Sequence, residues 1–110
     1  MGKLIYGTID IEIDDRLLAH LQIVIINKLR RGESLLMSWL DSPSIGDGRS
    51  AVWLNPSITL YFKFAGSRSP QIDREWLRTL SESAESSTGL ILRTDDGRLA
   101  YATGRRGGGG

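Results

Sequence analysis

The stretch Asp14–Gly32, DDRLLAHLQIVIINKLRRG, carries the strongest structural signal in the chain. Its apolar residues recur at the three- and four-residue spacing of a helix with one buried face. Asp14 and Asp15 provide an N-terminal cap and first-turn negative charge, and basic residues precede Gly32 at the other end. The β-branched run Ile23–Ile26 favours a strand, but the caps and the length of the stretch outweigh it. The stretch therefore predicts a helix that needs a partner surface.

Alternating segments on both sides of this helix predict that surface, a β-sheet. Residues 3–13 alternate as one half-buried strand, with Ile5 on its core face and Tyr6 on its outer face. A second helix is expected from Pro70 to the residue before Gly89. Three further strands and a closing hairpin complete the prediction, at Ser34–Leu40, Ser50–Leu54, Ile58–Phe64, and Leu90–Arg93 with Leu99–Ala102. The three strands are expected to form an antiparallel meander, and the hairpin to turn at Asp95–Gly97.

The predicted order is thus βαβββαββ. This order favours an α+β domain in which two helices cover one face of an antiparallel sheet of five or six strands. We expect one domain over residues 1–103 and a flexible Gly/Arg tail over residues 104–110. Because the helices cover one face only, function is expected on the open face of the sheet. The alternation alone does not say which face Trp39 and Trp53 occupy.

Composition excludes several classes of function. The chain has 110 residues, room for one core, and 14 Lys+Arg against 13 Asp+Glu, so no global field attracts nucleic acid or membrane. It has no cysteine and one histidine, so thiolate and multi-histidine metal sites are excluded and no metal is expected. We find no phosphate-binding loop or nucleophile elbow, and expect no cofactor and no catalytic residue. No apolar run could span a bilayer, so a cytoplasmic protein is expected.

One window without acidic residues, Gly48–Ile72, combines cations with aromatic rings. Tyr61 and Lys63 are two residues apart, so on a strand they share one face, and Arg49 and Arg68 flank them. Rings that stack on bases beside cations that hold phosphates are typical of sheets that bind single-stranded nucleic acid. An ordinary solvated face is the alternative, which we favour because the cations are few.

Two other anion-binding candidates have simpler explanations. Lys28, Arg30 and Arg31 could clamp a phosphate, but cations at a helix C-terminus also offset the helix dipole, and we favour that role. The segment Gly66–Pro70 could hold an anion at the start of the second helix through Arg68 and backbone N–H groups. The alternative is that Ser69 simply caps that helix.

The remaining polar features favour structural roles. Asp10, Glu12 and Asp14 could hold Mg²⁺ or Ca²⁺ on one strand face, but a solvated edge is the simpler interpretation. His20 has no second histidine or thiol to work with and is expected on the flank of a helix. Most of the tryptophans are expected in the core.

The sequence resembles a family of small actinobacterial proteins of about this length, over roughly residues 1–92. The segments that carry the resemblance are MGKLIYG from Met1, KLRRGES from Lys28, DGRS from Asp47, WLNPSI from Trp53, LYFKFAGSR from Leu60 and REW from Arg74. Members are often labelled ATP-dependent DNA ligase, which implies transfer of adenylate to the lysine of a K-x-D-G motif. The nearest matches, Ile45–Gly48 and Thr94–Gly97, lack that lysine. The label therefore finds no catalytic support in these residues.

Two functions from different classes remain. The first is a non-catalytic binding or self-association module that uses the open sheet face, with a homo-oligomer as one expected form. The second is an accessory protein that binds nucleic acid through the Gly48–Ile72 window.

Overall fold

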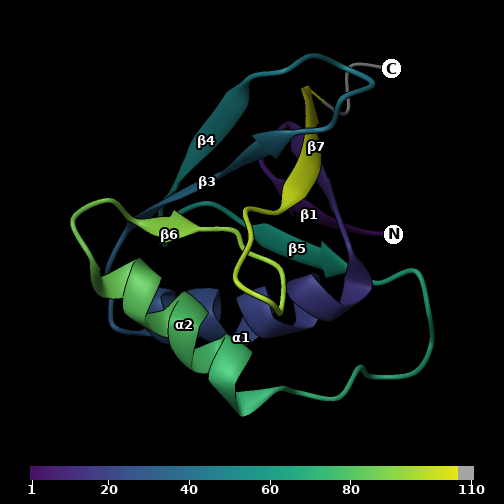
Figure 1. Cartoon of the computed structure of the whole chain (residues 1–110). Coiled ribbons are helices and arrows are strands. Elements are labelled where there is room, and N and C mark those ends of the chain that lie inside the picture. The colour runs from purple at the N-terminus through teal and green to yellow at the C-terminus, as the bar shows by residue number, and fades with distance from the viewer. Residues whose placement is uncertain (107–110) are drawn as a thin grey trace.

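The computed structural model describes residues 1–106 and confirms an α+β fold with two helices and seven strands (Figure 1). The part of the predicted flexible tail at residues 107–110 lies outside the described residues. In chain order the elements are β1 (Gly2–Tyr6), β2 (Ile9–Ile13), α1 (Asp15–Arg30), β3 (Leu35–Asp41), β4 (Arg49–Leu54), β5 (Leu60–Lys63), α2 (Arg74–Glu85), β6 (Leu90–Ile91) and β7 (Tyr101–Arg106).

The first predicted strand is a hairpin, β1 and β2, joined at Gly7 and Thr8. Gly7 has a positive φ of 59°, which glycine adopts without strain. The two-residue turn shifts the alternation by one, so that Leu4 pairs with Ile11 on the core face. The assignment of Tyr6 to the outer face is therefore wrong, since Tyr6 is buried and its hydroxyl accepts from Asn55 N–H at 2.9 Å.

The strands form one mixed sheet in the order β4-β3-β7-β2-β1-β5, with β6 also paired to β3. β3 and β4 pair antiparallel as predicted, but β5 pairs with β1, which places it at the opposite edge from β4. The predicted meander therefore ends after β4. β3 pairs in parallel with both β6 and β7, so the sheet is not wholly antiparallel.

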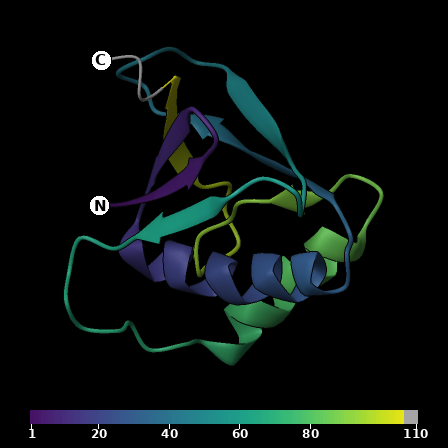
Figure 2. The ribbon, with the colours of Figure 1, turned by 180° about the vertical axis from the view of Figure 1, so that it is seen from behind.

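Both helices lie on one side of the sheet and pack against each other, as the two opposite views show (Figures 1 and 2). α1 begins as predicted, with the Asp14 carboxylate accepting from Leu17 N–H at 3.2 Å, and ends before Gly32, which has a φ of 75°. Its apolar face is fully buried between the sheet and α2. This burial supplies the stability that its β-branched residues do not.

α2 begins later than predicted. Its N-cap is Asp73, whose carboxylate accepts from the N–H groups of Glu75 and Trp76 at 3.0 and 3.1 Å. Pro70 therefore lies in the preceding irregular segment and not in the first helical turn, and Ile72 is exposed. An aspartate offers a better cap here than Ser69 because it also brings negative charge to the helix N-terminus.

The prediction of a flexible tail from residue 104 is wrong for Gly104, Arg105 and Arg106. These residues belong to β7 and pair with β2. A Cβ added at Gly104 would lie 2.9 Å from Cζ2 of Trp39, so the ring packs directly on the strand backbone. The closing hairpin is present around Gly97, with a bridge between Arg93 and Leu99, but its second strand continues through Arg106. β7 thereby joins β3 to β2 in the middle of the sheet.

Candidate binding surface

Alternation along β3 and β4 divides their side chains between the core and the open face. On β3, Met37 and Trp39 are buried, whereas Leu36 points outward. Trp53 pairs with Leu36 and is 58% exposed. The sheet therefore places Trp39 in the core and Trp53 on the open face.

Apolar side chains gather on this open face. The registers pair Leu36 with Trp53, Ser38 with Ile91, and Leu40 with Tyr101, which is 54% exposed. We call the six apolar residues here the open-face patch: Leu36, Leu40, Trp53, Ile91, Leu99 and Tyr101. Four of them, Leu36, Leu40, Ile91 and Leu99, line a hollow of about 640 Å³.

The charged side chains that line this hollow are both cations, Arg49 and Arg93. Arg93 donates to the carbonyl oxygen of Gly97 at 3.0 Å, which holds its guanidinium against the closing hairpin. Arg49 extends from the exposed side of β4, and among residues 1–106 it takes part in no ion pair. The patch is thus apolar with a free cation at its edge, a composition that suits contact with another protein chain.

The fold does not bring together all the cations of the predicted nucleic-acid window, Gly48–Ile72. Tyr61 and Lys63 do share the exposed face of β5, and β1 adds Lys3 directly opposite Lys63. Arg49, however, lies on β4 at the other edge of the sheet, and Arg68 lies in the irregular segment before α2. The structure therefore brings together Tyr61, Lys63 and the unpredicted Lys3, and it places Arg49 at the opposite edge. Arg68 lines a hollow against α1, beside Gln22 and Ile23.

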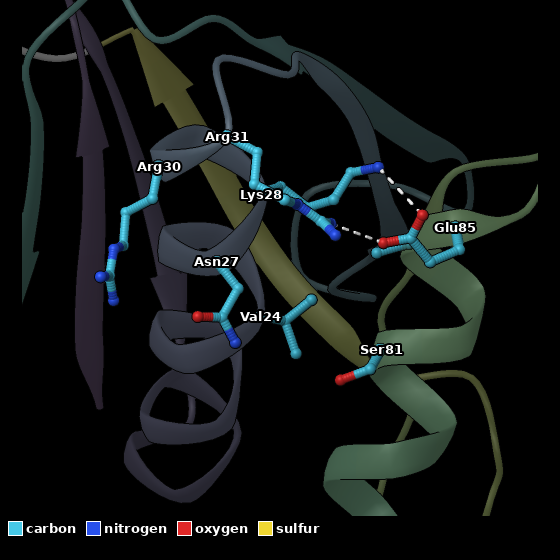
Figure 3. A pocket seen from close by; sticks show the side chains of 8 residues that line it. Val24, Asn27, Lys28, Arg30, Arg31, Ser81 and Glu85 are labelled. Atoms are coloured by element: carbon cyan, nitrogen blue, oxygen red, sulfur yellow. Dashed lines mark hydrogen bonds and ion pairs between the residues drawn. The ribbon is translucent and has the colours of Figure 1, made fainter.

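The cations at the end of α1 are largely paired. Lys28 Nζ lies 2.8 Å from Glu33. Lys28 Nζ and Arg31 lie 3.5 Å and 2.8 Å from Glu85 (Figure 3). The bond to Glu33 raises the pKa of Lys28, and the bond to Arg31 lowers the pKa of Glu85. Arg30 points away from this cluster (Figure 3). These carboxylates occupy the positions that a clamped phosphate would need, so the cluster joins the ends of α1 and α2.

The Gly66–Pro70 segment does not lie at the start of α2, as both its anion-binding and its Ser69-cap interpretations required. Of its backbone N–H groups, that of Gly66 donates to the Asp15 carboxylate at 3.0 Å, next to the N–H of the preceding Ala65, which donates to it at 3.1 Å. These backbone bonds lower the pKa of Asp15. The second helix begins only at Arg74, so its free N–H groups do not face this segment.

His20 is fully buried, which its position on a helix flank did not predict. Its Nδ1 lies 2.7 Å from the carbonyl oxygen of Arg16, and its Nε2 accepts from Asp73 N–H at 2.9 Å. This pair of partners fixes the neutral ring with the proton on Nδ1. The ring centroid lies 4.3 Å from that of Trp76, so His20 joins α1 to the start of α2. The local sequence around His20 could not predict these contacts, because Asp73 and Trp76 come from the start of the other helix.

Within residues 1–106, no three His, Asp or Glu side chains gather into a group that could hold a metal ion. Asp14 is occupied as the cap of α1, and Glu12 lies 3.8 Å from Arg105. No helix in this part of the chain is long and apolar enough to cross a membrane.

These features define a small α+β domain with helices on one side of a mixed sheet and an apolar patch on the other. The chain belongs to the family described as a domain of unknown function, DUF7882, whose model matches residues 1–95. This membership is consistent with the resemblance to a family of small proteins, and the description of the family contains no ligase label. No curated protein and no solved structure matches the chain.

Proposed function

We propose that this protein is a non-catalytic binding or self-association module that contacts another protein chain through the open-face patch. The observation that carries the proposal is that β4, β3 and β7 place apolar side chains on the same open face, with Trp53 and Tyr101 both more than half exposed. Apolar side chains gathered on one face favour burial against a partner, since each Å² removed from water contributes about 25 cal/mol.

Oxidative footprinting of aromatic side chains tests this proposal. Tyr101 and Tyr61 are 54% and 55% exposed, on different parts of the sheet, so Tyr61 is a matched control. Tyr101 and Trp53 should become protected relative to Tyr61 when the protein is concentrated or when a cell extract is added. Equal labelling of Tyr101 and Tyr61 under all conditions would contradict a binding role for the patch.

A second candidate function is nucleic-acid binding by β5 and β1. It is favoured by one observation, the pairing of Lys3 with Lys63 beside the exposed ring of Tyr61. Like charges directly opposite each other on a sheet destabilise it, so a bound phosphate would relieve their repulsion. Against it, Asp10 and Glu12 face the same side from the neighbouring strand.

Fluorescence anisotropy of labelled single-stranded, duplex and nicked DNA, at about 50 and 200 mM salt, tests this second function. Binding should weaken at the higher salt and in the variant Lys63→Glu. The matched control is Arg30→Glu, which reverses an exposed cation at the end of α1, outside β1 and β5. If Arg30→Glu weakens DNA binding as much as Lys63→Glu does, the binding is a nonspecific charge attraction and β5 is excluded as the site.

A further inference from the structure

The free edge of β4 is the starting point for a more specific inference. β4 ends the sheet, so one side of its backbone has no strand partner among residues 1–106. The side that faces β3 is fixed by a hydrogen bond from Asp41 N–H to Gly48 C=O at 2.9 Å. Because bonded pairs alternate in an antiparallel ladder, Ser50 and Val52 also bond toward β3. The N–H and C=O groups of Arg49, Ala51 and Trp53 therefore point away from the sheet.

The bonds of β3 on its other side agree with this alternation. Ser38 C=O accepts from Leu92 N–H at 2.9 Å, and Leu40 N–H donates to Ala100 C=O at 3.1 Å. Residues with even numbers on β3 thus bond away from β4, and those with odd numbers bond toward it. This independent set of bonds places the same three β4 residues on the free edge.

The same three residues also direct their side chains to the open face, where all three are exposed. If a second copy of β4 pairs antiparallel around a two-fold axis at Ala51, Arg49 of one copy lies opposite Trp53 of the other. Directly opposite side chains have Cβ atoms about 4.5–5.5 Å apart, close enough for a guanidinium to cover an indole ring. The small Ala51 side chains meet on the axis without a clash.

We propose that a second copy of this chain pairs along β4, in the register that places Ala51 opposite Ala51 and Arg49 over Trp53 of the partner copy. Three consecutive bonded pairs would exchange six backbone hydrogen bonds in this register. The pairing joins the two open-face patches into one continuous surface. It rests on the proposed function, because it names a second copy as the protein that the open face contacts.

The other sheet edge is a poor alternative for such pairing. β5 has four residues, and its exposed Lys63 stands opposite Lys3 within the same sheet. A lysine on a short edge strand is a common protection against edge-to-edge association. β4 has six residues and no acidic side chain or proline, and its one charge has an aromatic partner in the two-fold register. The difference between the edges favours β4.

Single-cysteine variants test the register, since the chain has no cysteine of its own. In the proposed register two Ala51→Cys residues have Cα atoms about 5.5 Å apart, within the range of a disulfide. Mild oxidation should convert Ala51→Cys to covalent dimer, whereas Ser50→Cys and Val52→Cys should stay monomeric. Preferential cross-linking of Ser50→Cys or Val52→Cys would overturn the register.

Sedimentation velocity between about 1 μM and 1 mM tests the edge itself. Ala51→Pro removes the N–H that pairs across the axis but none that bonds to β3, so it should abolish dimers while the circular dichroism spectrum stays native. Ala51→Ser keeps that N–H and is the matched control, which should dimerise as the parent does. A folded Ala51→Pro protein that still dimerises would refute pairing through β4.

The failures of the two proposals can be told apart. A protein that stays monomeric to 1 mM overturns the β4 pairing, yet protection of Trp53 by a cell extract would keep the binding module. Dimers that survive Ala51→Pro, with Trp53 unprotected both at high concentration and in a cell extract, overturn both proposals. Dimers lost in Ala51→Pro, with Trp53 protected at high concentration, support both.

Discussion

Gly104 provides the sharpest test of the fold, because the sequence suggests a tail where the structure has a central strand. Replacing Gly104 with alanine adds a methyl group 2.9 Å from Cζ2 of Trp39, closer than carbon atoms normally approach. Trp39 is 5% exposed and belongs to the hydrophobic core. Overpacking of this kind costs about 1–3 kcal/mol, so we expect Gly104→Ala to lower the free energy of unfolding by that amount.

Urea denaturation followed by circular dichroism measures this change. A loss of about 1–3 kcal/mol corresponds to a melting temperature lower by several degrees, since about 1 kcal/mol shifts a domain of this size by roughly 4–8 °C. Arg105→Ala, on the exposed face of the same strand, is the control and should change stability by less than about 0.5 kcal/mol. If Gly104→Ala is as stable as Arg105→Ala, then Gly104 does not pack on Trp39 and the placement of β7 is wrong.

Three further changes test contacts around α1. The folded-state pKa of Asp15 is lowered, so the stability that its carboxylate contributes is complete above about pH 4 and is lost as the pH falls further. Asp15→Asn should therefore lower the free energy of unfolding by about 1 kcal/mol at pH 7. In urea titrations the difference in this free energy between variant and parent should become smaller below pH 4. His20→Leu leaves the N–H of Asp73 without its partner and should cost about 1–3 kcal/mol by thermal melting, a loss that a merely exposed histidine would not give. Lys28→Met keeps the apolar stem but removes the ion pairs to the half-exposed carboxylates of Glu33 and Glu85. Chemical denaturation should therefore show a free energy of unfolding lower by less than about 1 kcal/mol.

The helix α1 was predictable because its signals are local. The Asp14 cap, the spacing of the buried residues and Gly32 all lie within the helix or next to it. The β1–β2 hairpin was not predicted because apolar and polar residues alternate without a break through its two-residue turn. In β1 the even-numbered residues face the core, whereas in β2 the odd-numbered residues do. Ile5, Ile9 and Ile11 look equivalent in the sequence, yet Ile5 lies on the opposite face from Ile11 once Gly7 turns the chain.

The candidate surface was predictable only within single strands. The shared face of Tyr61 and Lys63 follows from their spacing alone, and the structure has it. The arrival of Lys3 beside Lys63, and the distance from Arg49, depend on which strands pair, and strand pairing is set by packing across the whole domain. For the same reason the partners of Lys28 could not be inferred, since Glu85 comes from the other helix.

β7 links the stability of the domain to its open face. The strand pairs in parallel with β3 through Tyr101 and antiparallel with β2 through Gly104, so one short segment holds both halves of the sheet. A change in β7 would therefore alter stability and the position of Tyr101 together, and loss of binding would not identify the contact. Trp53 lies on the edge strand, where its exposed ring can be removed without disturbing the core. Variants of β4 thus report on binding, and variants of β7 report on the integrity of the sheet that presents it.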